Sequence, residues 1–172
     1  MQKFRIENDL SFQDVETIRR RQQKLLNVHL DYCRTQSPYY RRILEDLPRR
    51  PFRLEELPSL PLTAKSDLAE HNRDFIAAPA NDIVDLCFTS GTTGKPCRIT
   101  YTQQDLDRLA YNDALGFLAT GMEPADSILL TCTIDRCFIA GLAYYLGVIK
   151  VGATAVRNGL NSLESHSEII RS

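Results

Sequence analysis

Hydroxyl, glycine and lysine residues gather in one short stretch of the sequence. The stretch consists of Thr89, Ser90, Gly91, Thr92, Thr93, Gly94 and Lys95. Glycine reaches backbone angles that other residues avoid, so successive N–H groups of the stretch can converge on one point. The hydroxyls add short hydrogen-bond donors, and the lysine adds a mobile positive charge. This composition predicts a loop that binds phosphate groups, such as a triphosphate or a leaving pyrophosphate.

The segments on either side of this loop are typical of β-strands. Residues 83–88 before it and 98–101 after it are rich in β-branched and aromatic side chains. The common ATPase loop, G-x-x-x-x-G-K-[ST], is instead followed by a helix. Here Pro96 stands where that loop carries a magnesium-binding hydroxyl. The alternative is a plain glycine-rich turn, but a tight turn needs far fewer donors than this stretch carries.

Three segments resemble one family of enzymes. SGTTGKP at residues 90–96 resembles the phosphate-loop signature of the adenylate-forming enzymes, which include acyl- and aryl-CoA synthetases. SPYYR at residues 37–41 and LPLTAKSDL at residues 60–68 resemble the N-terminal region of phenylacetate–CoA ligases. The resemblance covers most of the chain but only the first part of such an enzyme. It implies a ligase that activates a carboxylate with ATP to an acyl-adenylate, releases pyrophosphate and transfers the acyl group to CoA.

The expected architecture is α/β and incomplete. Residues 1–80 are predicted to form a helical N-terminal region that ends in a proline-rich connector. Residues 81–172 are predicted to form a partial α/β subdomain of a larger AMP-binding domain. It would hold the phosphate loop in a β-hairpin, then a helix from residue 103 that ends at Gly121. A parallel β-α-β unit with a right-handed crossover would follow, with strands at 127–132 and 153–156.

A second ligand-facing segment is expected at residues 133–137, because ligands of parallel sheets bind at the carboxyl ends of the strands. In phenylacetate–CoA ligases the matching segment helps line the acyl and nucleotide sites. The resemblance therefore implies that substrate is lined by Ile134, Asp135, Phe138 and Gly141. Phe138 and Gly141 fit the family pattern, whereas Asp135 and Arg136 depart from it, which argues against phenylacetate itself as the substrate. A local ion pair, or a helix N-cap by Asp135, is an equally good interpretation of that carboxylate.

The resemblance also implies cofactors and partners. The full-length enzyme would use ATP with Mg²⁺ and CoA, act on a small-molecule carboxylate and form a homodimer. The family's adenine-stacking Tyr-Gly-x-Thr-Glu stretch, its Thr-Gly-Asp segment and its C-terminal catalytic lysine are not in this sequence. We therefore assign no catalytic residue here, and we expect the 172-residue chain alone to bind no cofactor tightly and to be inactive.

The overall composition excludes several other classes. A formal net charge of −1 does not indicate a nucleic-acid-binding protein, which would carry an excess of positive charge. No apolar run approaches the length of a membrane span. No Cys/His cluster has metal-binding spacing, and the odd count of 5 cysteines indicates a reduced, cytoplasmic protein. His71 and His166 have no nucleophile in a recognisable arrangement and are expected at the surface.

Two other functions remain open from the sequence. The first is an adenylate-forming enzyme whose acceptor is not CoA, of the acyl-protein synthetase or coenzyme F390 synthetase type. The second is a non-catalytic domain that keeps the loop only to bind phosphate. The residues that contact the acceptor lie largely outside this chain in such enzymes, so the sequence does not separate these alternatives.

Overall fold

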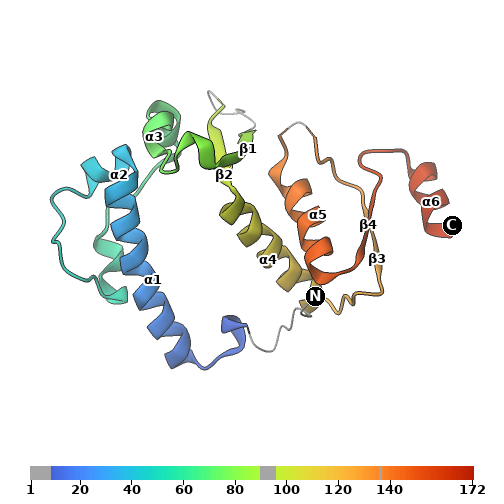
Figure 1. The fold of residues 1–172 in the computed structure, drawn as a ribbon, viewed down its shortest axis with the longest axis horizontal. Helices are drawn as coiled ribbons and strands as arrows, with labels where there is room; N and C mark the ends of the chain where they lie inside the picture. The colour runs from blue at the N-terminus through green and yellow to red at the C-terminus, as the bar shows by residue number, and fades with distance from the viewer. Residues whose placement is uncertain (1–8, 90–95, 136) are drawn as a thin grey trace. The chain divides into compact units, whose positions relative to one another are not determined.

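The structure is a computed structural model that describes residues 9–89, 96–135 and 137–172 (Figure 1). The described chain divides into two compact units. The first, which we call the helical unit, comprises residues 9–82 and the described part of 89–98. The second, the α/β unit, comprises the described residues of 83–88 and 99–172.

The helical unit is built on one long helix, α1, which spans Val15–Gln36. Asp14 caps its start by accepting a hydrogen bond from the Thr17 N–H, and Ser37 ends it. Ser37 also begins the next helix, because its hydroxyl accepts the Tyr40 N–H and Pro38 occupies the first turn. The remaining elements are η2 (Leu10–Phe12), α2 (Pro38–Ile43), η3 (Leu54–Ser59), α3 (Lys65–Glu70), η4 (Asn72–Phe75) and η5 (Ala80–Asp82).

The core of the helical unit is small and lies between α1, α2 and the connector. Leu30, Leu44 and Phe52 are its buried members. Two amide side chains of α1 tie the connector to this core. Asn27 pairs with both backbone groups of Phe52, at 2.7 Å to the N–H and 2.8 Å to the carbonyl, and Gln23 also donates to that carbonyl. The proline-rich connector, whose one helical element between Pro48 and Pro61 is the short η3, is therefore held against α1.

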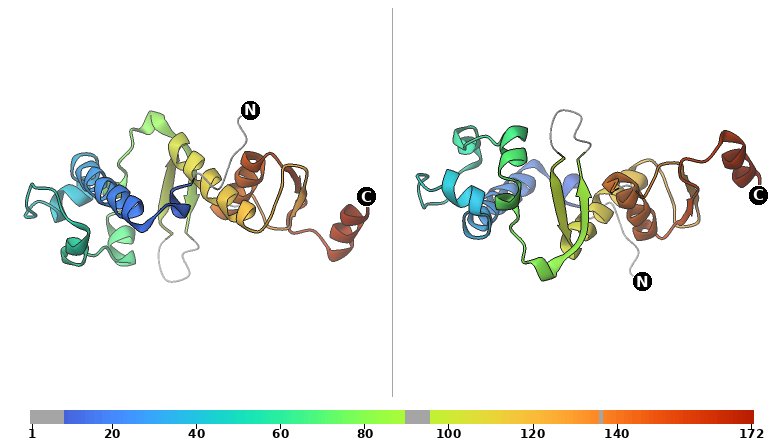
Figure 2. Two further views of the ribbon diagram at one scale, coloured as in Figure 1. Left: turned by 90° about the horizontal axis from the view of Figure 1, so that it is seen from below. Right: turned by 90° about the horizontal axis from the view of Figure 1, so that it is seen from above.

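The α/β unit contains two separate two-stranded sheets. β1 (Ile83–Phe88) pairs with β2 (Arg98–Thr102), and Figure 2 shows them as neighbouring strands. β3 (Ser127–Leu130) pairs in parallel with β4 (Thr154–Arg157), so that Ser127 lies opposite Thr154 and Leu130 opposite Arg157. The helices are α4 (Gln103–Ala119), α5 (Ile139–Val151), which connects β3 to β4, and α6 (Leu163–Arg171). The expected α/β class is confirmed.

Helices α4 and α5 pack directly against each other (Figure 1). Ala114 of α4 and Val148 of α5 are fully buried at their contact. A Cβ atom added to Gly147 would lie 2.5 Å from the Cβ of Asp113, so the close approach of the two helices requires glycine there. The expected start of a helix at residue 103 is confirmed, with Thr102 and Asp105 as the capping box of α4, and Gly152 ends α5 with φ 93°.

Across residues 9–89, 96–135 and 137–172, no helix combines the length and the apolar character needed to cross a membrane.

Candidate functional site

The predicted phosphate loop is closed at its base by Thr89 and Cys97. The Thr89 N–H donates to the Cys97 carbonyl at 3.0 Å, and the Cys97 N–H donates to the Thr89 hydroxyl oxygen at 3.0 Å. The Thr89 side chain is therefore a hydrogen-bond acceptor in the frame of the loop, with its own O–H still able to donate. The other predicted loop residues lie outside the described residues: Ser90, Gly91, Thr92, Thr93, Gly94 and Lys95.

The backbone beyond the loop is held by Asn72, a residue that the sequence did not single out. Its side-chain carbonyl accepts the Arg98 N–H at 3.2 Å, and its NH₂ group donates to the Arg98 carbonyl at 3.0 Å. The amide thus satisfies both backbone groups of Arg98, as a neighbouring strand would. No local pattern marks such a contact, because 26 positions separate the two residues.

Asn72 belongs to η4, and the start of α2 fixes the place of η4. The Tyr39 ring stacks on the Phe75 ring with centroids 4.0 Å apart, and the Ser37 hydroxyl donates to the Asp74 carbonyl at 2.9 Å. Ser37 is only 1% exposed. The segment SPYYR at residues 37–41 therefore supports η4, and through Asn72 it supports the chain that leaves the predicted loop.

A cavity of about 410 Å³ lies in the α/β unit at the carboxyl ends of β3 and β4. Two segments line it, residues 132–135 after β3 and residues 157–161 at the end of β4 and beyond. The Leu130 carbonyl joins these segments by accepting the N–H groups of Asn158 at 3.2 Å and Gly159 at 3.0 Å. A parallel sheet is expected to bind its ligands at this edge.

The structure places two of the four predicted substrate-lining residues on this cavity and the other two away from its lining. Ile134 and Asp135 line it. Phe138 is 46% exposed and is the N-cap residue of α5. Gly141 is buried in α5, where an added Cβ would lie 1.9 Å from the Thr133 carbonyl oxygen. Gly141 thus lets α5 approach the backbone that precedes Ile134, which is a positioning role.

The interpretation of Asp135 as a helix N-cap is wrong. Phe138 is the N-cap residue of α5, and its side chain makes no capping hydrogen bond. It is the backbone carbonyl of Asp135 that accepts a hydrogen bond, from the Phe138 N–H at 3.2 Å. Three residues separate Asp135 from the first helical residue, so its carboxylate is not placed to reach the first N–H groups of α5. The other interpretation, a pair with Arg136, falls on a residue outside the described ones.

The cavity holds charges of both signs. Asp135 brings an exposed carboxylate and Arg157 an exposed guanidinium. The Arg157 guanidinium lies over the Tyr145 ring, 5.1 Å from its centroid, in a cation–π contact that orients it. Polar recognition groups therefore stand beside the apolar side chains of Ile134 and Leu160.

Asn158 and His166 form a network beside this cavity, and His166, expected at the surface, is half-buried. The Asn158 NH₂ group lies 2.7 Å from His166 Nδ1 and donates to the Ser165 hydroxyl at 3.2 Å. The Asn158 carbonyl accepts the Asn161 NH₂ group at 2.8 Å. The histidine is half-buried and ties α6 to the turn after β4. The one sequence signal was the turn-forming pair Asn158–Gly159.

Within the part of the chain that the structure describes, no group of three or more His, Cys, Asp or Glu side chains could hold a metal ion.

Solved structures of CoA ligases share this fold. A 2-hydroxyisobutyryl-CoA ligase bound to 2-HIB-AMP and CoA in an open conformation superposes with a TM-score of 0.79 over 91% of this chain and 38% of that chain, at 19% identity. The same ligase in its thioesterification state gives a TM-score of 0.80, with 92% and 35% covered, at 21% identity. The fold is therefore that of part of an adenylate-forming CoA ligase.

The sequence is also similar to curated phenylacetate-coenzyme A ligases. The chain is 32% identical over 161 residues to the phenylacetate-coenzyme A ligase of Escherichia coli, covering 91% of this chain and 37% of that protein. It is 34% identical over 145 residues to the enzyme of the same name from Thermus thermophilus, covering 82% and 32%. The resemblance to phenylacetate–CoA ligases is confirmed, and the chain spans about a third of the length of these relatives. No protein-family model matches the chain.

Proposed function

We propose that this chain is the N-terminal part of an AMP-forming acid–thiol ligase that joins a carboxylate to CoA through an acyl-adenylate. The observation that carries the proposal is the similarity to phenylacetate-coenzyme A ligases along 91% of the chain. The shared fold of 2-hydroxyisobutyryl-CoA ligase supports it. Because these relatives are all named for CoA, we favour CoA over a different acceptor and over a non-catalytic phosphate-binding role.

The loop from Thr89 to Lys95 would hold the β- and γ-phosphates of ATP while the carboxylate attacks the α-phosphate. Negative charge develops on the departing pyrophosphate, and donors fixed in advance stabilise it at little reorganisation cost. The described frame around Thr89, Cys97 and Asn72 supports this role, because it holds both ends of the loop. Mg²⁺ would accompany the ATP, and we assign no ligand for it in this chain.

The cavity beside β3 and β4 would take part of the acyl-adenylate. Ile134 and Asp135 would line it, while Phe138 and Gly141 would set the position of the segment from the first turn of α5. The charges of Asp135 and Arg157 favour a carboxylate that carries a polar group over phenylacetate, whose ring offers none.

The proposal extends to the organisation of the chain. Residues 1–80 would be the helical N-terminal region, and residues 81–172 would be part of the AMP-binding domain. We also propose a cytoplasmic homodimer, which analytical ultracentrifugation of the full-length protein would test.

The direct test of function is pyrophosphate release by the full-length protein with ATP, Mg²⁺, CoA and a panel of aryl and hydroxylated carboxylates. We expect release that depends on one class of carboxylate, and acyl-CoA as the product. Replacing Thr92, Thr93 and Lys95 with alanine should lower the adenylation rate by about 100-fold or more, because each removes a donor to developing charge. Adenylate formation without any acyl-CoA would disprove the CoA assignment, and no pyrophosphate release with any carboxylate would disprove the ligase itself.

A further inference from the structure

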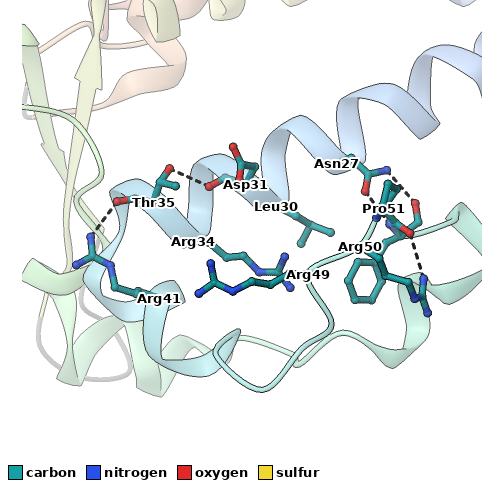
Figure 3. Close-up of a pocket in the computed structure, with 10 residues that line it drawn as sticks. Asn27, Leu30, Asp31, Arg34, Thr35, Arg41, Arg49, Arg50 and Pro51 are labelled. Carbon is teal, nitrogen blue, oxygen red and sulfur yellow. Dashed lines mark hydrogen bonds between the residues drawn. The ribbon is translucent and has the colours of Figure 1, made fainter.

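A groove lined by arginine side chains lies within the helical unit, between α1 and the segment after α2 (Figure 3). Its volume is about 620 Å³, and an adjoining cavity of about 300 Å³ shares three of its arginines. We call the two together the arginine groove. The arginines of the larger part are Arg34, Arg41, Arg49 and Arg50. None of these residues belongs to the predicted phosphate loop or to the cavity beside β3.

The shape of the arginine groove is fixed by its apolar floor. Leu30 and Phe52 are buried there, and the Asn27 amide holds Phe52 from both backbone groups. The Leu54 N–H donates to the Gln23 side chain at 3.0 Å, which extends the same attachment by one more contact. The connector that forms one wall is therefore pinned to α1, which forms the other.

Two of the arginines are held in place by backbone carbonyls. Arg34 Nη2 donates to the Leu47 carbonyl at 3.3 Å and to the Pro48 carbonyl at 3.2 Å, and Arg41 Nη2 donates to the Thr35 carbonyl at 2.9 Å. A guanidinium has five N–H donors, so Nη1 and Nε of both residues stay available to a ligand. Because these side chains are already ordered, a ligand loses less entropy when it binds them.

The charge of the arginine groove is only partly balanced by the protein. Arg50 is neutralised by Glu56, with Arg50 Nη1 2.9 Å from Glu56 Oε2. In residues 9–89, 96–135 and 137–172, neither Arg34 nor Arg41 has a carboxylate partner, and Arg49 makes neither an ion pair nor a hydrogen bond. Carboxylates also line the two cavities, Asp31 in the larger and Glu45 in the smaller, and they oppose an anion.

We propose that the arginine groove binds an oligophosphate, the chain of two or three phosphates found in inorganic polyphosphates and nucleotides. The paired N–H donors of a guanidinium match the spacing of phosphate oxygens. Three guanidiniums without acidic partners therefore favour a ligand that carries several such oxygens. The Phe52 ring is 3% exposed and is covered by the Arg34 and Arg50 guanidiniums, 5.9 and 5.3 Å from its centroid. No aromatic face is open for stacking among the residues that line the groove. The arginine groove therefore recognises the phosphate chain and not a nucleotide base.

The test is a titration of the ¹⁵N-labelled chain with inorganic tripolyphosphate, ATP and CoA, followed through the arginine Nε–Hε resonances. We expect the resonances of Arg34, Arg41 and Arg49 to shift, with dissociation constants for tripolyphosphate and ATP within about threefold of each other. CoA, whose diphosphate is esterified at both ends, should bind more weakly. A dissociation constant for ATP far below that for tripolyphosphate would overturn recognition of the phosphate chain alone.

Three variants localise the site. Arg49→Gln should weaken tripolyphosphate binding about tenfold, since it removes a charged donor that has no role in the fold. Asp31→Asn should strengthen binding about threefold by removing an opposing charge. Arg21→Gln, an equally exposed change on α1 outside the groove, should leave binding unchanged. If Arg21→Gln weakens binding as much as Arg49→Gln does, binding is non-specific and the proposal is wrong.

A fourth variant separates this site from the predicted loop. The chain with Thr92, Thr93 and Lys95 replaced by alanine should keep the shifts of the three groove arginines. Loss of those shifts would assign the binding to the loop and overturn the groove as a separate site. Tighter binding of an acidic peptide or of RNA than of tripolyphosphate would also overturn it, in favour of a macromolecular partner.

Discussion

At the scale of single residues, Asn72 of η4 holds both backbone groups of Arg98, which belongs to the same helical unit. Asn72→Ala removes both partners from a half-buried backbone, so we expect a loss of about 2 kcal/mol in the free energy of unfolding. Urea denaturation followed by circular dichroism measures this loss. The matched control is Asn81→Ala at an exposed position, which should change stability by less than about 0.5 kcal/mol. Equal effects of the two changes would show that Asn72 does not hold the strand.

Glu56 makes the helical unit sensitive to acid. Hydrogen bonds from the Arg50 guanidinium, and next from the Arg53 N–H, lower the pKa of Glu56 from 4.5 to about 2. The unfolded chain takes up a proton near pH 4.5 while the folded chain resists until about pH 2, so the unfolded state binds more protons in this window. The stabilisation is therefore complete above pH 4.5 and is lost as the pH falls toward 2.

Glu56→Gln tests this linkage, because the amide does not titrate. Urea midpoints measured at about pH 5, 4 and 3 should fall less steeply for Glu56→Gln than for the unchanged chain. Glu55→Gln is the control, since Glu55 is an exposed neighbour whose carboxylate has no hydrogen bond to any described residue. A slope that stays the same in Glu56→Gln would mean that other carboxylates carry the acid sensitivity.

At the scale of elements, the first turn of α5 determines where the cavity-lining segment lies. An added Cβ at Gly141 would sit 1.9 Å from the Thr133 carbonyl oxygen, and backbone cannot yield as a flexible side chain would. Gly141→Ala should therefore push α5 away from residues 132–135 and destabilise the α/β unit by about 1–3 kcal/mol. Thermal denaturation measures the loss, and amide chemical shifts of Ile134 and Asp135 report the displacement.

Gly116 of α4 provides the matched control, because no described atom outside its chain neighbours and the nearby backbone of α4 lies within 4 Å of a Cβ added there. Gly116→Ala should be neutral or stabilising by up to about 1 kcal/mol, since alanine is the better helix former. If both substitutions stabilise the protein, the close contact at Gly141 is not a constraint on α5.

Elements with strong local signals were predictable from the sequence. The capping box of Thr102 and Asp105 starts α4 where expected, and the left-handed Gly152, which ends α5, is an equally local signal. The start of α1 was not predicted correctly: SFQD at residues 11–14 predicts a capping box with Ser11 as the N-cap, whereas Asp14 is the N-cap of α1 and Ser11 lies in η2. The strand expected at 127–132 ends at Leu130, where its partner β4 ends at Arg157 and the ladder has no further residues to pair.

The candidate site was only partly predictable, for a physical reason. Ile134 and Asp135 follow a strand, and position after a strand is visible in a sequence. Asn72, Arg157 and His166 act through contacts with backbone or side chains that no periodicity or motif reports. The arginine groove was missed similarly, since Arg34 and Arg49 come from separate segments that meet only because Asn27 pins the connector to α1.

At the scale of the whole molecule, the chain corresponds to 37% of the length of its relative in Escherichia coli. The 2-hydroxyisobutyryl-CoA ligase that shares its fold is likewise matched over 38% of its chain. In our proposal the loop provides donors for the departing pyrophosphate, while the groups that recognise adenine and ribose are elsewhere in the full-length enzyme.

We therefore expect the 172-residue chain alone to form no acyl-adenylate. Catalysis of this kind depends on holding both reactants in line, and a loop that binds only the phosphates leaves the α-phosphate and the carboxylate unoriented. The measurement is carboxylate-dependent exchange of labelled pyrophosphate into ATP, run in parallel on this chain and on the full-length protein. Exchange by the full-length protein only, abolished there by the loop substitutions, is the expected result. Exchange by the isolated chain would show that these residues already contain a complete adenylation site. The proposal that adenine and ribose are recognised elsewhere in the full-length enzyme would then be wrong.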